Sequence, residues 1–108
     1  MNIGQIAKMA KQMQTQMAQA QEELRQTTLE ASAGGGAVRI VITGAQEVRS
    51  VEIDPSAVDP DEVEMLQDLV MTAINEAIGR SKELERERMS GIAGAMGLPG
   101  MPGLPGFG

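Results

Sequence analysis

The sequence has no cysteine, histidine, tryptophan or tyrosine, and its only aromatic side chain is Phe107. The absence of cysteine excludes a disulfide framework. Together these absences remove the residues that most often serve as nucleophiles, general bases and zinc ligands. Any hydrophobic core must therefore be built from Ile, Val, Leu, Met and Ala.

Long apolar runs are also missing. No eighteen consecutive apolar residues occur, and the start, MNIGQIAKMAKQMQTQ, has no continuous apolar segment of the kind found in signal peptides. From these absences we expect a soluble, intracellular protein that does not bind a membrane.

Charge is unevenly distributed along the chain, which has a net charge of −6. Residues 1–21 contain two lysines and no acid, residues 52–68 contain seven acids and no base, and residues 80–88 contain four bases among three acids. A polyanion is repelled by the average field, so only local basic patches could attract one. The bases in those patches are Lys8, Lys11, Arg80, Lys82, Arg86 and Arg88.

A helix is predicted at residues 3–26. Apolar residues recur there at steps of three and four, on one face, while Gln, Lys and Thr occupy the other face. The apolar positions are Ile6, Met9, Met13, Met17, Ala20 and Leu24. This methionine stripe indicates packing; a methionine metal site is the alternative, disfavoured because Cys and His are absent.

Three short antiparallel strands are predicted in residues 27–54, separated by turns at 34–36 and 44–47. Val38, Ile40 and Ile42 alternate with more polar positions, as in a half-buried strand. The three glycines resemble a phosphate-binding loop, but such a loop lies between a strand and a following helix. Here a strand follows, so a hairpin turn is predicted.

A second long helix is predicted to follow Asp59-Pro60-Asp61-Glu62, with Asp59 as N-cap, Pro60 at N1 and Glu62 at N3. Its apolar stripe continues to about Met89. At about 1.5 Å per residue this helix is about 45 Å long, whereas a six-residue strand spans only about 20 Å. Both helices should therefore overhang the sheet, and the apolar overhang predicts a dimer.

The acidic segment at 54–68 does not fit a calcium-binding EF-hand, because neither register supplies the required glycine and alternating oxygen ligands. We therefore predict no metal and no cofactor.

Residues 91–108 are rich in Gly and Pro and carry no charge. This composition predicts a disordered, polyproline-like tail after a folded domain at residues 1–90, and its three G-x-P triplets are too few for a collagen helix.

Several features in this order resemble the YbaB/EbfC family of bacterial nucleoid-associated proteins. They are the Gly34–Gly36 triplet before a strand, the Thr43-Gly44 turn, Val51-Glu52-Ile53-Asp54-Pro55, Met65-Leu66-Gln67-Asp68-Leu69-Val70, and Ala73 to Ala77 around Asn75. The Met- and Gln-rich first helix and the Pro/Gly/Met-rich tail also fit, so the likeness covers nearly the whole chain.

The resemblance implies an α+β fold of the order α-β-β-β-α and a tight homodimer with projecting helices. It also implies a protein of the cytoplasm and nucleoid that binds duplex DNA with little sequence preference, alters its conformation and influences gene expression, and that is not an enzyme. It suggests the six bases named above as DNA contacts. From the residues alone, the 80–88 run is more typical of a solvated helix face than of a DNA contact. The alternative function is a scaffold dimer in which the methionine-rich helix and the tail bind a protein partner.

Overall fold

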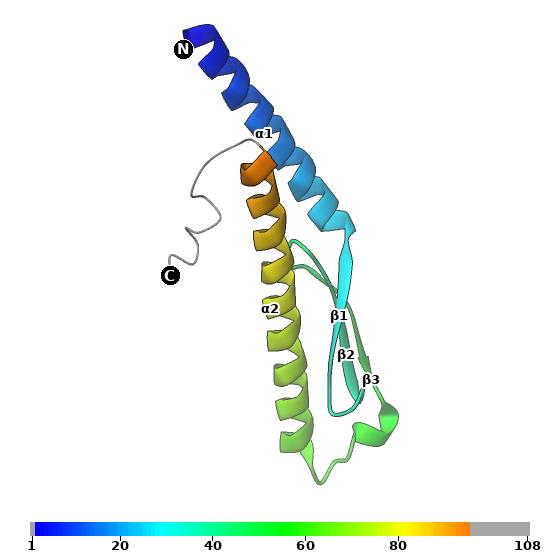
Figure 1. Cartoon of the computed structure of the whole chain (residues 1–108). Helices are drawn as coiled ribbons and strands as arrows, with labels where there is room; N and C mark the ends of the chain where they lie inside the picture. The colour runs from blue at the N-terminus through cyan, green and yellow to red at the C-terminus, as the bar shows by residue number, and fades with distance from the viewer. Residues whose placement is uncertain (1, 96–108) are drawn as a thin grey trace, which may run out of the picture.

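The computed structural model describes residues 2–95, which form a helix, three strands and a second long helix (Figure 1). The elements are α1 (Ile3–Gln26), β1 (Thr28–Ala33), β2 (Val38–Thr43), β3 (Val48–Ile53), a short 3-10 helix η1 (Pro55–Ala57) and α2 (Val63–Ala95). This order confirms the predicted α-β-β-β-α fold. The described part of the chain contains no helix long and apolar enough to cross a membrane.

Helix α1 has the predicted bounds. Asn2 caps its start, because the side-chain oxygen accepts a hydrogen bond from the Gln5 amide at 2.8 Å. The helix ends where Thr27 takes an extended conformation and leads directly into β1. This direct connection fixes the direction in which α1 leaves the sheet.

The sheet has the order β1-β2-β3, and both pairs are antiparallel. Gly34, Gly35 and Gly36 all have positive φ, between 66° and 97°, which glycine adopts without a Cβ penalty. They form the β1–β2 turn, so the hairpin prediction is confirmed. Between β2 and β3 the register shifts at Val41/Ile42, and this bulge leaves Arg49 without an opposite residue.

The core lies between α2 and the first two strands. Val38, Ile40 and Ile42 of β2 are fully buried, as the predicted alternation required. Ala73 and Ala77 of α2 are buried against them. Alanine at these positions lets the helix backbone approach the sheet closely, which helps to compensate for the absence of aromatic residues.

The predicted start of the second helix is wrong by a few residues. Asp59 does not cap α2: its side chain accepts a hydrogen bond from the Asp61 amide at 2.9 Å, and its carbonyl accepts one from Glu62. These bonds close a turn over residues 59–62, and α2 begins only at Val63. The reason is that Asp side chains stabilise local turns as readily as helix starts.

The predicted end of the second helix is also wrong. Helix α2 continues past Met89 through Gly91 and Gly94 to Ala95. Ile92 lies beside Ala20 of α1 where the two helices meet, and Ala93 is buried. Packing against α1 thus outweighs the low helix propensity of the two glycines. The rest of the predicted tail, residues 96–108, lies outside the described residues.

The molecule is elongated, with dimensions of 70 × 29 × 16 Å. Both helices extend beyond the sheet at the same end, and the start of α1 projects furthest (Figure 1). Only Ala20 and Leu24 of the predicted α1 stripe are buried. The remaining stripe residues are partly or largely exposed in the single chain, because α1 has no neighbour along its projecting part.

The β2–β3 turn joins all the main elements. The Gly44 amide donates to the carbonyls of Leu24 and Thr27, at 2.9 and 3.0 Å, which ties the turn to the end of α1. The fully buried Ser81 of α2 donates from Oγ to the Thr43 carbonyl at 2.6 Å and accepts from the Gln46 amide at 3.1 Å. The turn is therefore held between both helices.

Replacing Gly44 by Ala should destabilise the protein by about 1–3 kcal/mol, the usual cost of overpacking. A Cβ at this position would lie 2.7 Å from Leu24 Cδ2 and 3.1 Å from the Leu24 carbonyl oxygen. Gly79→Ala is the matched control, since nothing lies within 4 Å of its Cβ position in the α2 interior. It should stabilise by about 0.5–1 kcal/mol. Urea unfolding of both variants checks the opposite signs.

Candidate nucleic-acid interface

Lys8 and Lys11 lie together near the free end of α1. They line a shallow groove of about 370 Å³ with Gln12, Thr15 and Gln16. Thr15 Oγ1 donates to the Lys11 carbonyl at 3.0 Å, so its hydroxyl oxygen keeps acceptor capacity toward solvent. The groove offers ammonium and amide donors from one continuous helix face.

No carboxylate neutralises these two lysines. Residues 2–21 include no acid, and within residues 2–95 neither Lys8 nor Lys11 has a salt-bridge partner. Two unpaired cations on one helix turn produce a local positive field on a chain of net charge −6. This is the kind of local patch that the charge distribution suggested.

Three of the four predicted contacts on α2 already have protein partners. Arg80 donates to the Glu30 carbonyl of β1, Arg86 pairs with Glu83 on the same helix, and Arg88 pairs with Glu23 of α1. Lys82 has no ion pair among the residues that the structure describes.

The two ion pairs are exposed, and exposed pairs contribute only about 0–1 kcal/mol. Arg86 and Arg88 can therefore exchange a carboxylate for a phosphate at small cost. Arg80 differs, since its bond holds α2 to the edge strand and has a role in the fold.

The basic residues do not form a single patch in one chain. Arg88 lies beside Glu23, twelve residues from Lys11 along α1, which is about 18 Å at 1.5 Å per residue. The structure thus brings Lys8 and Lys11 together and places Arg86 and Arg88 separately, nearer the sheet. Gln12, Thr15 and Gln16 join the first group, and only the helical period could have identified them from the sequence.

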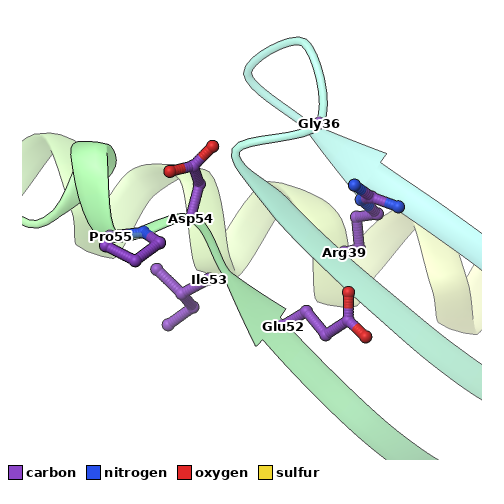
Figure 2. A pocket seen from close by; sticks show the side chains of 6 residues that line it. All are labelled: Gly36, Arg39, Glu52, Ile53, Asp54 and Pro55. Atoms are coloured by element: carbon purple, nitrogen blue, oxygen red, sulfur yellow. The ribbon is translucent and has the colours of Figure 1, made fainter.

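A different pocket, of about 410 Å³, lies at the open end of the β2–β3 hairpin (Figure 2). Arg39 of β2 lies opposite Glu52 of β3 and near Asp54, which follows β3, so its positive charge is balanced by two negative ones. Arg49 is similarly close to Glu47 Oε1, at 3.5 Å. These sheet arginines are therefore weak candidates for phosphate contacts.

Asp54 illustrates the electrostatics of this pocket. Hydrogen bonds from the Ser56 amide and hydroxyl, both 2.9 Å long, lower the pKa of its carboxyl, and the nearby Arg39 charge lowers it further. Across the acidic segment as a whole, no group of three or more acids within the described ranges is placed to hold a metal ion.

An apolar groove runs along α2, with a volume of about 430 Å³. It is lined by Val63, Leu66, Gln67, Val70, Met71, Ile74 and Asn75. Helix α2 packs on β1 and β2, so the inner face of β3 is left partly open. Val51 and Ile53 point to the core side, since they pair with Ile40 and Val38, and yet both are exposed. The α2 groove and the inner face of β3 are thus two apolar surfaces that the single chain leaves uncovered.

Ser56→Ala should raise the pKa of Asp54, because the hydroxyl donor is lost while the amide donor remains. A lowered pKa means that Asp54 stabilises the fold above its unfolded-state pKa, and that this contribution is lost as the pH falls through the folded-state pKa. Carboxyl-carbon NMR titration measures the midpoint. Glu22 is the internal control: its pKa is lowered by Arg25 and Gln26, so its midpoint should stay unchanged.

The chain is similar in sequence to known bacterial proteins. The model of the YbaB/EbfC DNA-binding family matches residues 1–96. A nucleoid-associated protein of Acetivibrio thermocellus is 48% identical over 93 residues, covering 86% of this chain and 82% of that one. A nucleoid-associated protein of Chloroflexus aurantiacus is 50% identical over 94 residues, covering 87% and 94%.

Among solved structures, an uncharacterized protein from Helicobacter pylori has a similar fold. The TM-score is 0.73, with 24% sequence identity over 81% of this chain and 91% of the other. At this identity the likeness concerns the fold alone.

Proposed function

The chain belongs to the YbaB/EbfC DNA-binding family, and from this membership we propose that it is a nucleoid-associated protein that binds duplex DNA as a homodimer. The observation that carries the proposal is the unpaired Lys8 and Lys11 on the projecting end of α1. The proposal involves no catalysed reaction, cofactor or small-molecule substrate, and it places the protein at the nucleoid.

The uncovered apolar surfaces support self-association. Val63 and Met71 on the α2 groove are 51% and 56% exposed, and Val51 and Ile53 of β3 add to this area. Exposed apolar surface on neighbouring residues is typical of an interaction site. A two-fold pairing of α2 and β3 with a second copy would bury it, and two-fold dimers are the commonest homo-oligomers.

A dimer would present each basic segment twice. Each α1 arm contributes only a few phosphate contacts, so a single arm binds weakly. Two arms on one particle raise the effective concentration of the second contact, and weak contacts then add. We propose that Lys8 and Lys11 make the principal contacts, that Arg86, Arg88 and Lys82 contribute after exchanging partners, and that Arg80 contributes least.

Little sequence preference is expected. Phosphate contacts position a protein on DNA without reading bases, and specificity requires side chains aimed at base edges in a groove. The lysine face of α1 also carries glutamines and a threonine. Residues 2–24 contain no arginine, the side chain that most often recognises guanine through two hydrogen bonds. Two arms holding one duplex would alter its path through backbone contacts alone.

Sedimentation equilibrium at micromolar concentration should give about twice the monomer mass of 11.4 kDa. Val63→Asp and Met71→Asp should each shift the protein toward monomer, since they bury an unpaired charge in the pairing. Met65→Asp is the matched control, because Met65 is also exposed but does not line the groove. A folded wild-type monomer under these conditions would contradict the proposed dimer.

DNA binding should weaken with salt. With about four phosphate contacts per dimer, log K falls with log salt at a slope of about −3.6. Lys8→Gln with Lys11→Gln should weaken binding to all duplexes alike and flatten this slope. Arg39→Gln with Arg49→Gln removes the same charge from the sheet and should have little effect. Fluorescence anisotropy of labelled duplexes across a salt series measures both quantities.

Two results would count against this footprint. An unchanged slope in the lysine variant would place the contacts elsewhere, with Arg86 and Arg88 the next to neutralise. No binding by the wild-type protein even at low salt would reject DNA binding and favour the scaffold function.

A further inference from the structure

One apolar face of α1 is buried at its C-terminal end and largely exposed toward the N-terminus, with Met13 half-buried between them. Leu24 is 2% exposed and Ala20 is 4% exposed, where α2 and the sheet cover them. Toward the N-terminus the same face is uncovered: Met17 is 39% exposed, Met9 45%, Ile6 52% and Ile3 84%. The stripe therefore continues beyond the end of its cover. It borders a groove of about 590 Å³, which is lined by Ala7, Ala10, Lys11, Met13, Gln14 and Met17.

The cover ends because α2 ends. The two helices run in opposite directions, since Arg88 meets Glu23 whereas Ile92, further along α2, lies beside Gln16, Gln19 and Ala20. Each further turn of α2 thus lies against an earlier turn of α1 (Figure 1). At Ala95 the chain is directed along α1 toward the exposed part of the stripe.

The sequence that follows Ala95 has a matching pattern. Residues 96–108 carry no charge, and after Met96 large apolar side chains recur at every third position as Leu98, Met101, Leu104 and Phe107. Each of the first three is followed by proline. Proline favours the polyproline II conformation, which has three residues per turn and would align these four side chains on one edge.

We propose that residues 96–108 dock on the exposed methionine face of α1 in the same chain. The segment is long enough: thirteen residues at about 3.1 Å each reach about 40 Å. The uncovered stripe from Met17 to Ile3 spans about 21 Å at 1.5 Å per residue. Docking continues the α1–α2 interface beyond the end of α2. It leaves Lys8 uncovered, because Lys8 is about 200° around the helix from Ile6, whereas Lys11 lies at the border of the methionine face.

The same chain is favoured over another occupant for a physical reason. The segment is covalently attached next to the face, and a short tether gives an effective concentration of millimolar order. Residues 96–108 carry no charged side chain, and Lys11 is the single charged residue among those that line the groove. Met9 and Met17 are flexible and polarisable, which suits an extended segment lacking a rigid shape of its own.

Disulfide trapping tests the proposal in the full-length chain, which has no cysteine of its own. The test pair is Met9→Cys with Met101→Cys. The matched control is Thr15→Cys with Met101→Cys, because Thr15 is exposed and lies on the lysine groove, about 120° around the helix from Met9. The test pair should oxidise within one chain about tenfold faster than the control, as a docking preference of about 1.4 kcal/mol would give.

Equal rates for the two pairs would overturn the proposal, because an undocked segment samples both faces alike. Mainly interchain disulfides at low protein concentration would assign the face to a second copy and would also overturn it.

A second measurement avoids introduced disulfides. Phe107→Trp adds the only tryptophan, so its emission reports the end of the segment alone. The emission should shift to shorter wavelength than in the same variant carrying Ile6→Gln and Met9→Gln, which alter exposed positions only. Identical spectra, with unchanged helix content by circular dichroism, would reject docking. Neither test requires DNA, so its outcome is independent of the proposed function.

Discussion

The close approach at Gly44 is the constraint on which the rest of the structure depends. The turn between β2 and β3 touches Leu24 at the end of α1 and Leu84 on α2, and there is no room for a Cβ. Its amide bonds the end of α1, while buried Ser81 of α2 bonds the carbonyl of Thr43 just before it. One four-residue turn thus fixes both helices relative to the sheet, and so determines where α1 and α2 project beyond it (Figure 1).

This arrangement gives the protein a narrow core and long uncovered surfaces. The core is one layer of Val and Ile from β2 facing Ala73 and Ala77 of α2. A chain without large aromatic side chains cannot thicken that layer, so much of its apolar surface stays accessible on α1, α2 and β3. Association with other surfaces, rather than internal packing, is how such a fold can bury the remainder. The exposed apolar faces therefore follow from this architecture.

Acidic and basic side chains occupy different parts of the structure. Acids gather where the hairpin ends and α2 begins, and they are partly used locally: Asp54 binds the Ser56 amide and hydroxyl, and Asp59 closes a turn. The bases near the sheet are also used, with Arg80 on a β1 carbonyl and Arg88 on α1. Lys8 and Lys11 are left without such a role on the projecting arm. An acidic protein can therefore present a positive surface locally, because salt screens the electrostatic field of the distant acids before it reaches the two lysines.

The sequence by itself determined the elements and their order. Apolar residues at steps of three and four predicted α1, and the alternation at Val38, Ile40 and Ile42 predicted the buried strand. The glycine triplet predicted the first turn. All three signals depend on local geometry alone. The sequence also pointed to Lys8 and Lys11, because neighbouring residues in one helix stay neighbours. Only the tertiary structure decided the bounds of α2, where Asp59 preferred a turn and contact with α1 carried the helix through Gly91. Likewise only the fold decided which arginines were already occupied, because Arg80 and Arg88 meet partners that are 50 and 65 residues away in the chain. Contacts of that range arise from packing, and no local pattern encodes them.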